Sequence, residues 1–142
     1  MSTTLAPVAH RTVEIDGVEI FYREAGSPDA PVVLLPHGYP CSSFEFRHFM
    51  PALGDRWRLV APDLPGFGYS ATPDATRFAY TFDGFADFLE RFTVAKQLTR
   101  YAIFLHDYGS QFGLRLAMRA RASRRADHPE RRHLRGPTWA EV

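Results

Sequence analysis

The chain has 142 residues, of which 45% are hydrophobic and 14% aromatic, so it is long enough to bury the core of about one globular domain. The formal net charge of +1 argues neither for a nucleic-acid partner nor for an acidic partner of the chain as a whole, and we expect no nucleic-acid partner. The sequence contains neither an apolar run of about eighteen residues nor a basic leader followed by an apolar segment, so we expect no membrane insertion and no secretion.

Cys41 is the single cysteine of the chain, which excludes an internal disulfide and a zinc site built on cysteines. A lone cysteine favours a reducing, cytoplasmic setting. We expect Cys41 to be a small buried side chain. The sequence carries no motif for a metal ion or a cofactor, and we expect none.

The first third of the chain predicts an antiparallel hairpin, a buried strand and a helix. Residues 12–22 alternate apolar and polar side chains around Asp16-Gly17, which is a typical hairpin turn. Residues 32–35 are continuously apolar, as in a strand that is covered on both faces. The apolar side chains of residues 42–53 recur with the spacing of an amphipathic helix that Ser42 or Ser43 can cap.

The remaining elements alternate strand and helix. Residues 57–61 predict a strand, and a helix follows from Thr81. Residues 101–105 predict a fully buried strand, and the last helix runs from Gly109. This order predicts an α/β fold with a mostly parallel sheet, an antiparallel leading hairpin and helices on both faces.

Three loops follow the carboxyl ends of the parallel strands, where ligands bind in such sheets. They contain His37-Gly38-Tyr39, Asp63 and Asp107. Asp107 lies at a corner between strand and helix, where the helix dipole favours an ionised carboxylate by about 0.3–1 kcal/mol. Such a carboxylate is either a helix N-cap or a nucleophile that attacks an electrophilic carbon. The convergence of the three loops favours the nucleophile.

Other polar residues near this corner have simpler interpretations. His106 immediately precedes Asp107, so its side chain is expected to point away from the carboxylate. Ser110 is expected on the polar surface of the first helical turn. Asp63 is expected to accept backbone N–H bonds and thereby stabilise its turn.

Residues 13–118 resemble the α/β-hydrolase superfamily, specifically its epoxide hydrolase and haloalkane dehalogenase branch. The resemblance is carried by the motifs LLPHGYP at 34–40, PDLPGFGYS at 62–70 and HDYG at 106–109. It implies that Asp107 is the nucleophile that forms an alkyl-enzyme ester, which a histidine-activated water then hydrolyses. It also implies an oxyanion hole and a supporting loop. The oxyanion donors are the backbone N–H groups of Tyr39 and Tyr108, and the supporting residues are His37, Gly38, Pro40 and Gly109.

The two tyrosines bear on the substrate, which the resemblance implies to be a small molecule. Dehalogenases favour a tryptophan after the nucleophile and an asparagine or tryptophan after the His-Gly pair, whereas this chain has Tyr108 and Tyr39. The His-Gly-x-Pro pattern at 37–40 is similar to epoxide hydrolases. We therefore rank epoxide hydrolysis first and carbon–halogen cleavage as the alternative. The sequence does not indicate an oligomeric state.

The character of the sequence changes after Met118. Residues 119–135 carry seven arginines and almost no large apolar side chain, and the whole chain has sixteen arginines against one lysine. Back-translation in a shifted reading frame permits a family-like turn and strand, so we interpret residues 119–142 as a frameshifted segment outside the hydrolase part, 1–118. The catalytic histidine and third acidic residue are then missing, and we expect an inactive, truncated chain. An inactive remnant whose arginine-rich tail binds a polyanion is the non-enzymatic alternative.

Overall fold

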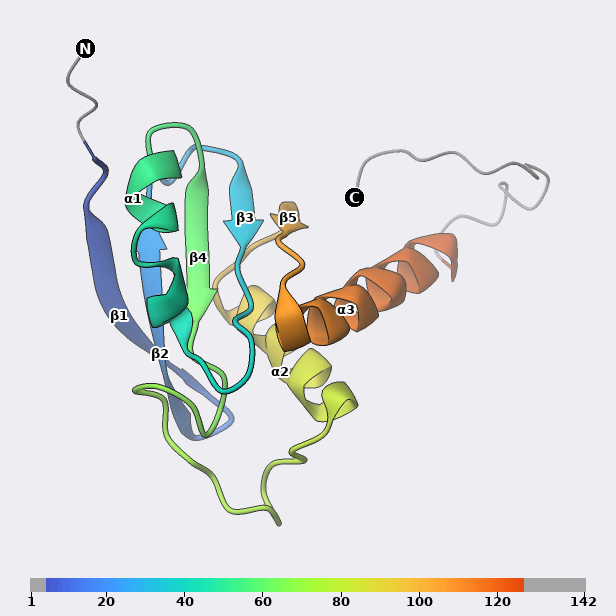
Figure 1. Cartoon of the computed structure of the whole chain (residues 1–142). Coiled ribbons are helices and arrows are strands. Elements are labelled where there is room, and N and C mark those ends of the chain that lie inside the picture. Colours follow the sequence, from blue (N-terminus) through green and yellow to red (C-terminus); the bar gives the residue numbers. More distant parts are fainter. Residues whose placement is uncertain (1–4, 127–142) are drawn as a thin grey trace.

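The computed structural model of the chain describes residues 5–126 (Figure 1). Within this part, five strands form one mixed sheet in the order β1-β2-β4-β3-β5. The leading strands pair antiparallel, β1 with β2 and β2 with β4, whereas β3 pairs parallel with β4 and β5. The bounds are β1 Val8–Ile15, β2 Val18–Ala25, β3 Val32–Leu34, β4 Arg58–Pro62 and β5 Tyr101–Ile103.

The predicted hairpin is confirmed and is longer than its sequence pattern indicates. Asp16 and Gly17 form its turn with φ of 52° and 74°, a conformation that Gly and Asp tolerate best. The register places Ile15 opposite Val18 and continues to Val8 opposite Ala25.

Helices cover both faces of the sheet, as expected (Figure 1). On one face α2 (Phe82–Ala95) and α3 (Asp107–Ala126) pack over a core that includes Phe92 and Leu116. On the other face the 3₁₀ helix η1 (Ser43–Phe46) and α1 (Phe49–Leu53) pack over a smaller core. The Thr81 hydroxyl caps α2 by accepting a hydrogen bond from Gly84 N at 3.0 Å, so the predicted start of this helix is confirmed.

The single helix expected over residues 42–53 is wrong, because η1 and α1 are separate. Pro51 explains the break, since it has no N–H to donate to the carbonyl of Arg47 in a continuous helix. By restarting at Phe49, the chain places Pro51 in the first turn of α1, where a missing N–H costs nothing.

The last strand and helix also differ from expectation. β5 ends at Ile103 and is not fully buried, since Ala102 is exposed and Leu105 is 50% exposed. The physical reason is that β5 is an edge strand of the described sheet, paired with β3 alone. α3 begins two residues earlier than expected and continues past Met118 to Ala126, its second half extending away from the sheet (Figure 1).

The parallel strands β3, β4 and β5 determine where the site lies. Because these strands run in the same direction, their carboxyl ends meet at one edge of the sheet. The loops that follow them carry His37, Asp63 and Asp107 to that edge.

Candidate active site

Asp107 occupies the turn between β5 and α3 and is exposed. Its φ of 45° lies in the left-handed region, which few residues other than Gly, Asn and Asp adopt. The turn is tight because α3 passes very close to the preceding loop: a Cβ on Gly109 would lie 2.1 Å from the carbonyl oxygen of Pro36. Only glycine at position 109 permits this approach.

The Asp107 carboxylate binds two backbone donors through one oxygen. Oδ1 accepts hydrogen bonds from Tyr39 N at 2.9 Å and Tyr108 N at 2.6 Å. These bonds, that of Tyr39 first, lower the pKa of Asp107 below its ordinary value. Among residues 5–126 none donates a hydrogen bond to Oδ2, so the two oxygens of the carboxylate differ in their surroundings.

Gly38 makes room for the carboxylate. A Cβ at this position would lie 2.7 Å from both Cβ and Oδ1 of Asp107, which no side chain can tolerate. Gly38 N donates to Oε1 of Glu45 at 3.1 Å, and its carbonyl accepts from Cys41 N at 3.1 Å. Glu45 could not be singled out from the sequence, because it is η1 that brings this side chain back to a loop seven residues earlier.

His37 lies buried beneath this loop and is fully hydrogen-bonded. Its Nε2 accepts from Leu64 N at 3.0 Å, and its Nδ1 lies 2.8 Å from the carbonyl oxygen of Gly38. An acceptor at Nε2 requires the proton on Nδ1, so the hydrogen bonds assign a neutral imidazole. Burial is the main reason that the pKa of His37 is lowered. His37 therefore joins the loops after β3 and β4 and lacks a free nitrogen for proton transfer.

Asp63 stabilises its turn as predicted. Its buried carboxylate accepts from Ser43 N at 2.7 Å and from Tyr69 N at 2.8 Å. Arg23, also buried, lies 3.9 Å from Oδ1 and compensates the charge.

The other polar residues near the corner form no hydrogen bond with the Asp107 carboxylate. The His106 ring stacks on Phe104 with centroids 6.2 Å apart. The Ser110 hydroxyl donates to the carbonyl oxygen of Asp107, within the first turn of α3. Cys41 is exposed, so its expected burial is wrong: it follows Tyr39 and Pro40 on a loop that is itself exposed.

A cavity of about 410 Å³ adjoins the residues that hold the carboxylate, although Asp107 itself does not line it. Tyr39 and Tyr108, whose backbones bind Asp107, line one side of it, and side chains from α2, α3 and the loop after β4 complete it. The sequence analysis missed this cavity, because its phenylalanines have the spacing of ordinary core residues. Phe82 is the one lining residue that could have indicated the cavity from the sequence, because a large apolar side chain is unusual at the first position of an amphipathic helix.

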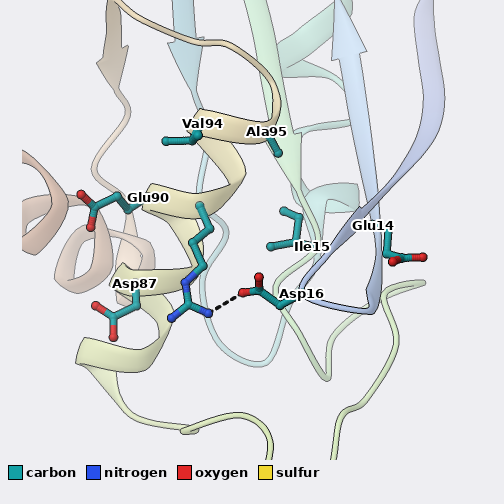
Figure 2. Close-up of a pocket in the computed structure, with 8 residues that line it drawn as sticks. Glu14, Ile15, Asp16, Asp87, Glu90, Val94 and Ala95 are labelled. Carbon is teal, nitrogen blue, oxygen red and sulfur yellow. Dashed lines mark hydrogen bonds and ion pairs between the residues drawn. The ribbon is translucent and has the colours of Figure 1, made fainter.

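A second cavity of about 440 Å³ lies between the hairpin and α2 (Figure 2). Acidic side chains dominate its lining, and Asp16 forms an ion pair with Arg91 at 2.6 Å. Asp107 and the two tyrosines do not line it. This cavity is therefore separate from the candidate site.

Among residues 5–126, no three His, Cys, Asp or Glu side chains gather in an arrangement that could hold a metal ion. None of the helices in this part of the chain has both the length and the apolar character needed to cross a bilayer.

Comparison with curated proteins finds hydrolases. The chain is 38% identical over 110 residues to an uncharacterised hydrolase of Saccharomyces cerevisiae, covering 78% of this chain and 37% of that protein. It is 37% identical over 109 residues to a haloalkane dehalogenase of Bradyrhizobium diazoefficiens, covering 77% and 34%. It is 46% identical over 66 residues to an epoxide hydrolase of Mycobacterium tuberculosis, covering 46% and 20%. The chain thus spans 37% or less of the length of these relatives.

Solved structures and family membership agree with these relatives. A haloalkane dehalogenase from Bradyrhizobium elkanii superposes with a TM-score of 0.74 at 33% identity, covering 80% of this chain and 38% of that one. An epoxide hydrolase from Vigna radiata gives 0.71 at 31% identity, with 78% and 35% covered. Residues 31–131 match the family described as alpha/beta hydrolase fold. The chain therefore has part of this fold and belongs to the α/β-hydrolase family.

Proposed function

We propose that Asp107 is the nucleophile of a hydrolase that opens epoxides. The observation that carries the proposal is the asymmetry of its carboxylate, in which Tyr39 N and Tyr108 N hold Oδ1 and leave Oδ2 without a donor. The lowered pKa of Asp107 keeps the group ionised at neutral pH, and an ionised carboxylate is the reactive form.

The geometry assigns different tasks to the two oxygens. Oδ2 attacks a carbon of the epoxide, the bond from that carbon to the ring oxygen breaks, and the resulting alkoxide takes a proton from solvent water, which leaves hydroxide. Oδ1 becomes the carbonyl oxygen of the ester and remains between its two donors. When water later attacks Cγ, negative charge develops on Oδ1, where each preorganised donor contributes about 2.7–4 kcal/mol.

Hydrolysis of the ester needs a general base, and neither of the histidines that flank the site in the sequence, His37 and His106, is free to serve. His37 is neutral, buried and bonded at both nitrogens, and the His106 ring stacks on Phe104. His128 and His133 lie outside the described residues. We propose that the 142-residue chain forms the ester and does not turn over, as the sequence analysis expects.

Carbon–halogen cleavage is the second candidate, and the similarity to haloalkane dehalogenases favours it. The attack by Oδ2 is the same, but a halide leaves. The tyrosines that follow Gly38 and Asp107 favour the epoxide, because the resemblance described under the sequence analysis leads us to expect tryptophan or asparagine at these positions in a dehalogenase.

Intact-protein mass spectrometry distinguishes these reactions on the 142-residue chain. An epoxide adds its entire mass to the protein, because its oxygen stays attached, whereas a haloalkane adds only its alkyl group and releases halide. We expect one adduct per chain with 1,2-epoxybutane, located on Asp107 by peptide mapping. The adduct should be absent from Asp107→Asn and present in Asp29→Asn, an exposed carboxylate elsewhere. An equal adduct in Asp107→Asn would remove Asp107 from the mechanism.

A further inference from the structure

Six aromatic side chains form a closed circuit around the cavity beside Asp107. Each ring contacts the next, with centroid separations between 4.9 and 6.1 Å. All six also line the cavity. We call this circuit the aromatic belt, and its members in order of contact are Tyr39, Phe67, Phe85, Phe112, Phe82 and Tyr108.

The belt joins the cavity to the reactive carboxylate. Tyr39 and Tyr108 contribute their rings to the belt and their backbone N–H groups to Oδ1 of Asp107. Gly38, Tyr39 and Tyr108 all line the cavity and all contact the Asp107 carboxylate, so a group held in the cavity lies one residue away from it. Resting on the proposed function, this adjacency means that the belt selects the substituent carried by the electrophilic carbon.

The lining of the cavity favours an uncharged, flat group. Besides the belt it contains Gly38, Leu64, Tyr80 and Thr81, so among residues 5–121 no charged side chain lines it. The hydroxyls of Tyr80 and Thr81 are already engaged, with the Pro73 carbonyl and Gly84 N respectively. A charged substituent would lose its hydration there without gaining an ionic partner, because the described lining offers only hydroxyls, backbone groups and apolar side chains.

We propose that the belt binds the aryl group of an aryl-substituted epoxide. Aromatic rings prefer offset or edge-to-face neighbours at about 4.5–7 Å, and the belt offers such neighbours on several sides. An apolar cavity of about 150 Å³ already accepts a benzene ring. The cavity of about 410 Å³ therefore has room for a phenyl group and the epoxide carbons next to it.

Aromatic rings also bind organic cations, but the surroundings of this belt disfavour a cation. The guanidinium of Arg115 lies 5.3 Å from the centroid of the Phe82 ring. This guanidinium places a positive charge beside the belt and already forms a cation–π contact with the Phe82 ring.

The first experiment compares ester formation by styrene oxide and 1,2-epoxybutane on the 142-residue chain. We expect styrene oxide to alkylate Asp107 at least tenfold faster than 1,2-epoxybutane, after correction for the two rates with free acetate. Phe82→Ala should reduce this preference by about tenfold, because it opens the belt at a half-exposed position. Phe44→Ala, which removes an exposed phenylalanine outside the cavity, should leave the preference unchanged. Adducts without aryl preference would overturn the proposal.

The second experiment measures binding without reaction. We expect 1-phenyl-1,2-ethanediol to bind the unmodified chain in ligand-observed NMR and to bind Phe82→Ala at least fivefold more weakly. Phe82→Leu removes the aromatic ring but keeps an apolar side chain at the start of α2. It should bind the diol as weakly as Phe82→Ala, and it replaces Phe82→Ala in the comparison if the alanine variant does not fold. Binding of the diol without any ester formation would defeat the proposed function and leave the belt proposal standing. Binding of phenyltrimethylammonium in preference to the diol, or equal diol binding by all variants, would refute the aryl site.

Discussion

Oδ1 of Asp107 lies 2.9 Å from the backbone nitrogen of Tyr39, a residue 68 positions earlier in the chain. This bond holds the turn after β5 against the loop after β3. It is possible because Gly38 has no side chain, so that the carboxylate occupies the space of a Cβ. The position of the Asp107 carboxylate therefore depends on two loops and not on the turn at Asp107 alone.

Gly38→Ala should displace the carboxylate. The new Cβ would lie 2.7 Å from Oδ1, and the bond from Tyr39 N would be lost as Asp107 moves. We expect the rate of ester formation to fall at least tenfold and the free energy of unfolding to fall by about 1–3 kcal/mol. The measurements are adduct formation by mass spectrometry and denaturant unfolding.

Gly17→Ala is the matched control, since it strains a hairpin turn at φ 74° where the nearest contact is the Arg77 side chain at 3.4 Å. It should reduce stability by about 1 kcal/mol and leave ester formation at the level of the unmodified chain. If Gly38→Ala reacts equally fast, the contact does not position the carboxylate.

The hydrogen bonds to Asp107 predict its titration. Because they lower the pKa of the folded state, Asp107 should remain ionised from neutral pH to below 3.8, its ordinary value. The stabilising contribution of the ionised group is then present above pH 3.8 and is lost as the pH falls through the folded pKa. A ¹³C NMR titration of the side-chain carboxyl, assigned by loss of the signal in Asp107→Asn, measures the midpoint. A midpoint at or above 3.8 would contradict the bonding described.

His37 should be required for stability and not for proton transfer. In His37→Ala, Leu64 N and the Gly38 carbonyl lose a buried partner, and each such group costs about 1–3 kcal/mol. His37→Asn, which can donate to one and accept from the other, should recover part of this loss. Urea unfolding of the three proteins is the measurement. A pH-dependent reaction rate that disappears in His37→Asn at unchanged stability would instead assign it a proton-transfer role.

The lowered pKa of His37 also predicts a pH effect on folding. Near pH 6.5 the unfolded state binds more protons at this residue than the folded state, since burial disfavours the charged imidazole. Stability should therefore rise with pH through this range and fall as the pH drops below about 6.5. His37→Asn should lack this part of the pH dependence.

The order of elements could be predicted from the sequence because local patterns carry it. Asp16-Gly17 specifies a turn, and Thr81 before an amphipathic run specifies a helix start. Contacts between distant segments could not be predicted in the same way. The bond between Gly38 N and Glu45, and the belt that joins Tyr39 to Phe82, depend on how three loops fold onto one sheet edge. Cys41 shows the same limit, because only the path of its loop leaves it exposed.

The roles of Asp107, Tyr39 and Tyr108 remain predictions, although their geometry supports them. The cytoplasmic setting and the absence of a nucleic-acid partner also remain predictions. The edge position of β5 was the main fold feature that local pattern misread, since residues 101–105 have the composition of a buried strand. An apolar run shows that a strand can be buried, whereas the strands and helices packed around it decide whether it is buried.

The coding DNA should contain a one-base insertion or deletion near codons 118–120. The reason is the sequence change at Met118, since GC-rich DNA read in a wrong frame encodes mainly Arg, Ala and Pro. Arg119 pairs with Asp83 and Asp87 of α2, so the described part of α3 remains joined to the fold. Sequencing across these codons is the measurement. An unbroken frame, together with salt-sensitive DNA binding by the chain, would favour the polyanion-binding alternative.

The uncovered edge of β5 predicts self-association of the 142-residue chain. Within residues 5–126 this strand pairs with β3 alone, and exposed apolar side chains follow it at Phe104 and Leu105. Unpaired backbone groups beside apolar surface can pair with strands of other molecules.

Ala102→Lys places a charge at an exposed position of β5. It should weaken association at least tenfold, about 1.4 kcal/mol, as measured by sedimentation velocity over a range of concentrations. Val94→Lys, at a 73% exposed position of α2, adds the same charge away from the edge and should not weaken association. A chain that stays monomeric at every concentration, or equal effects of the two lysines, would show that β5 is not the associating edge.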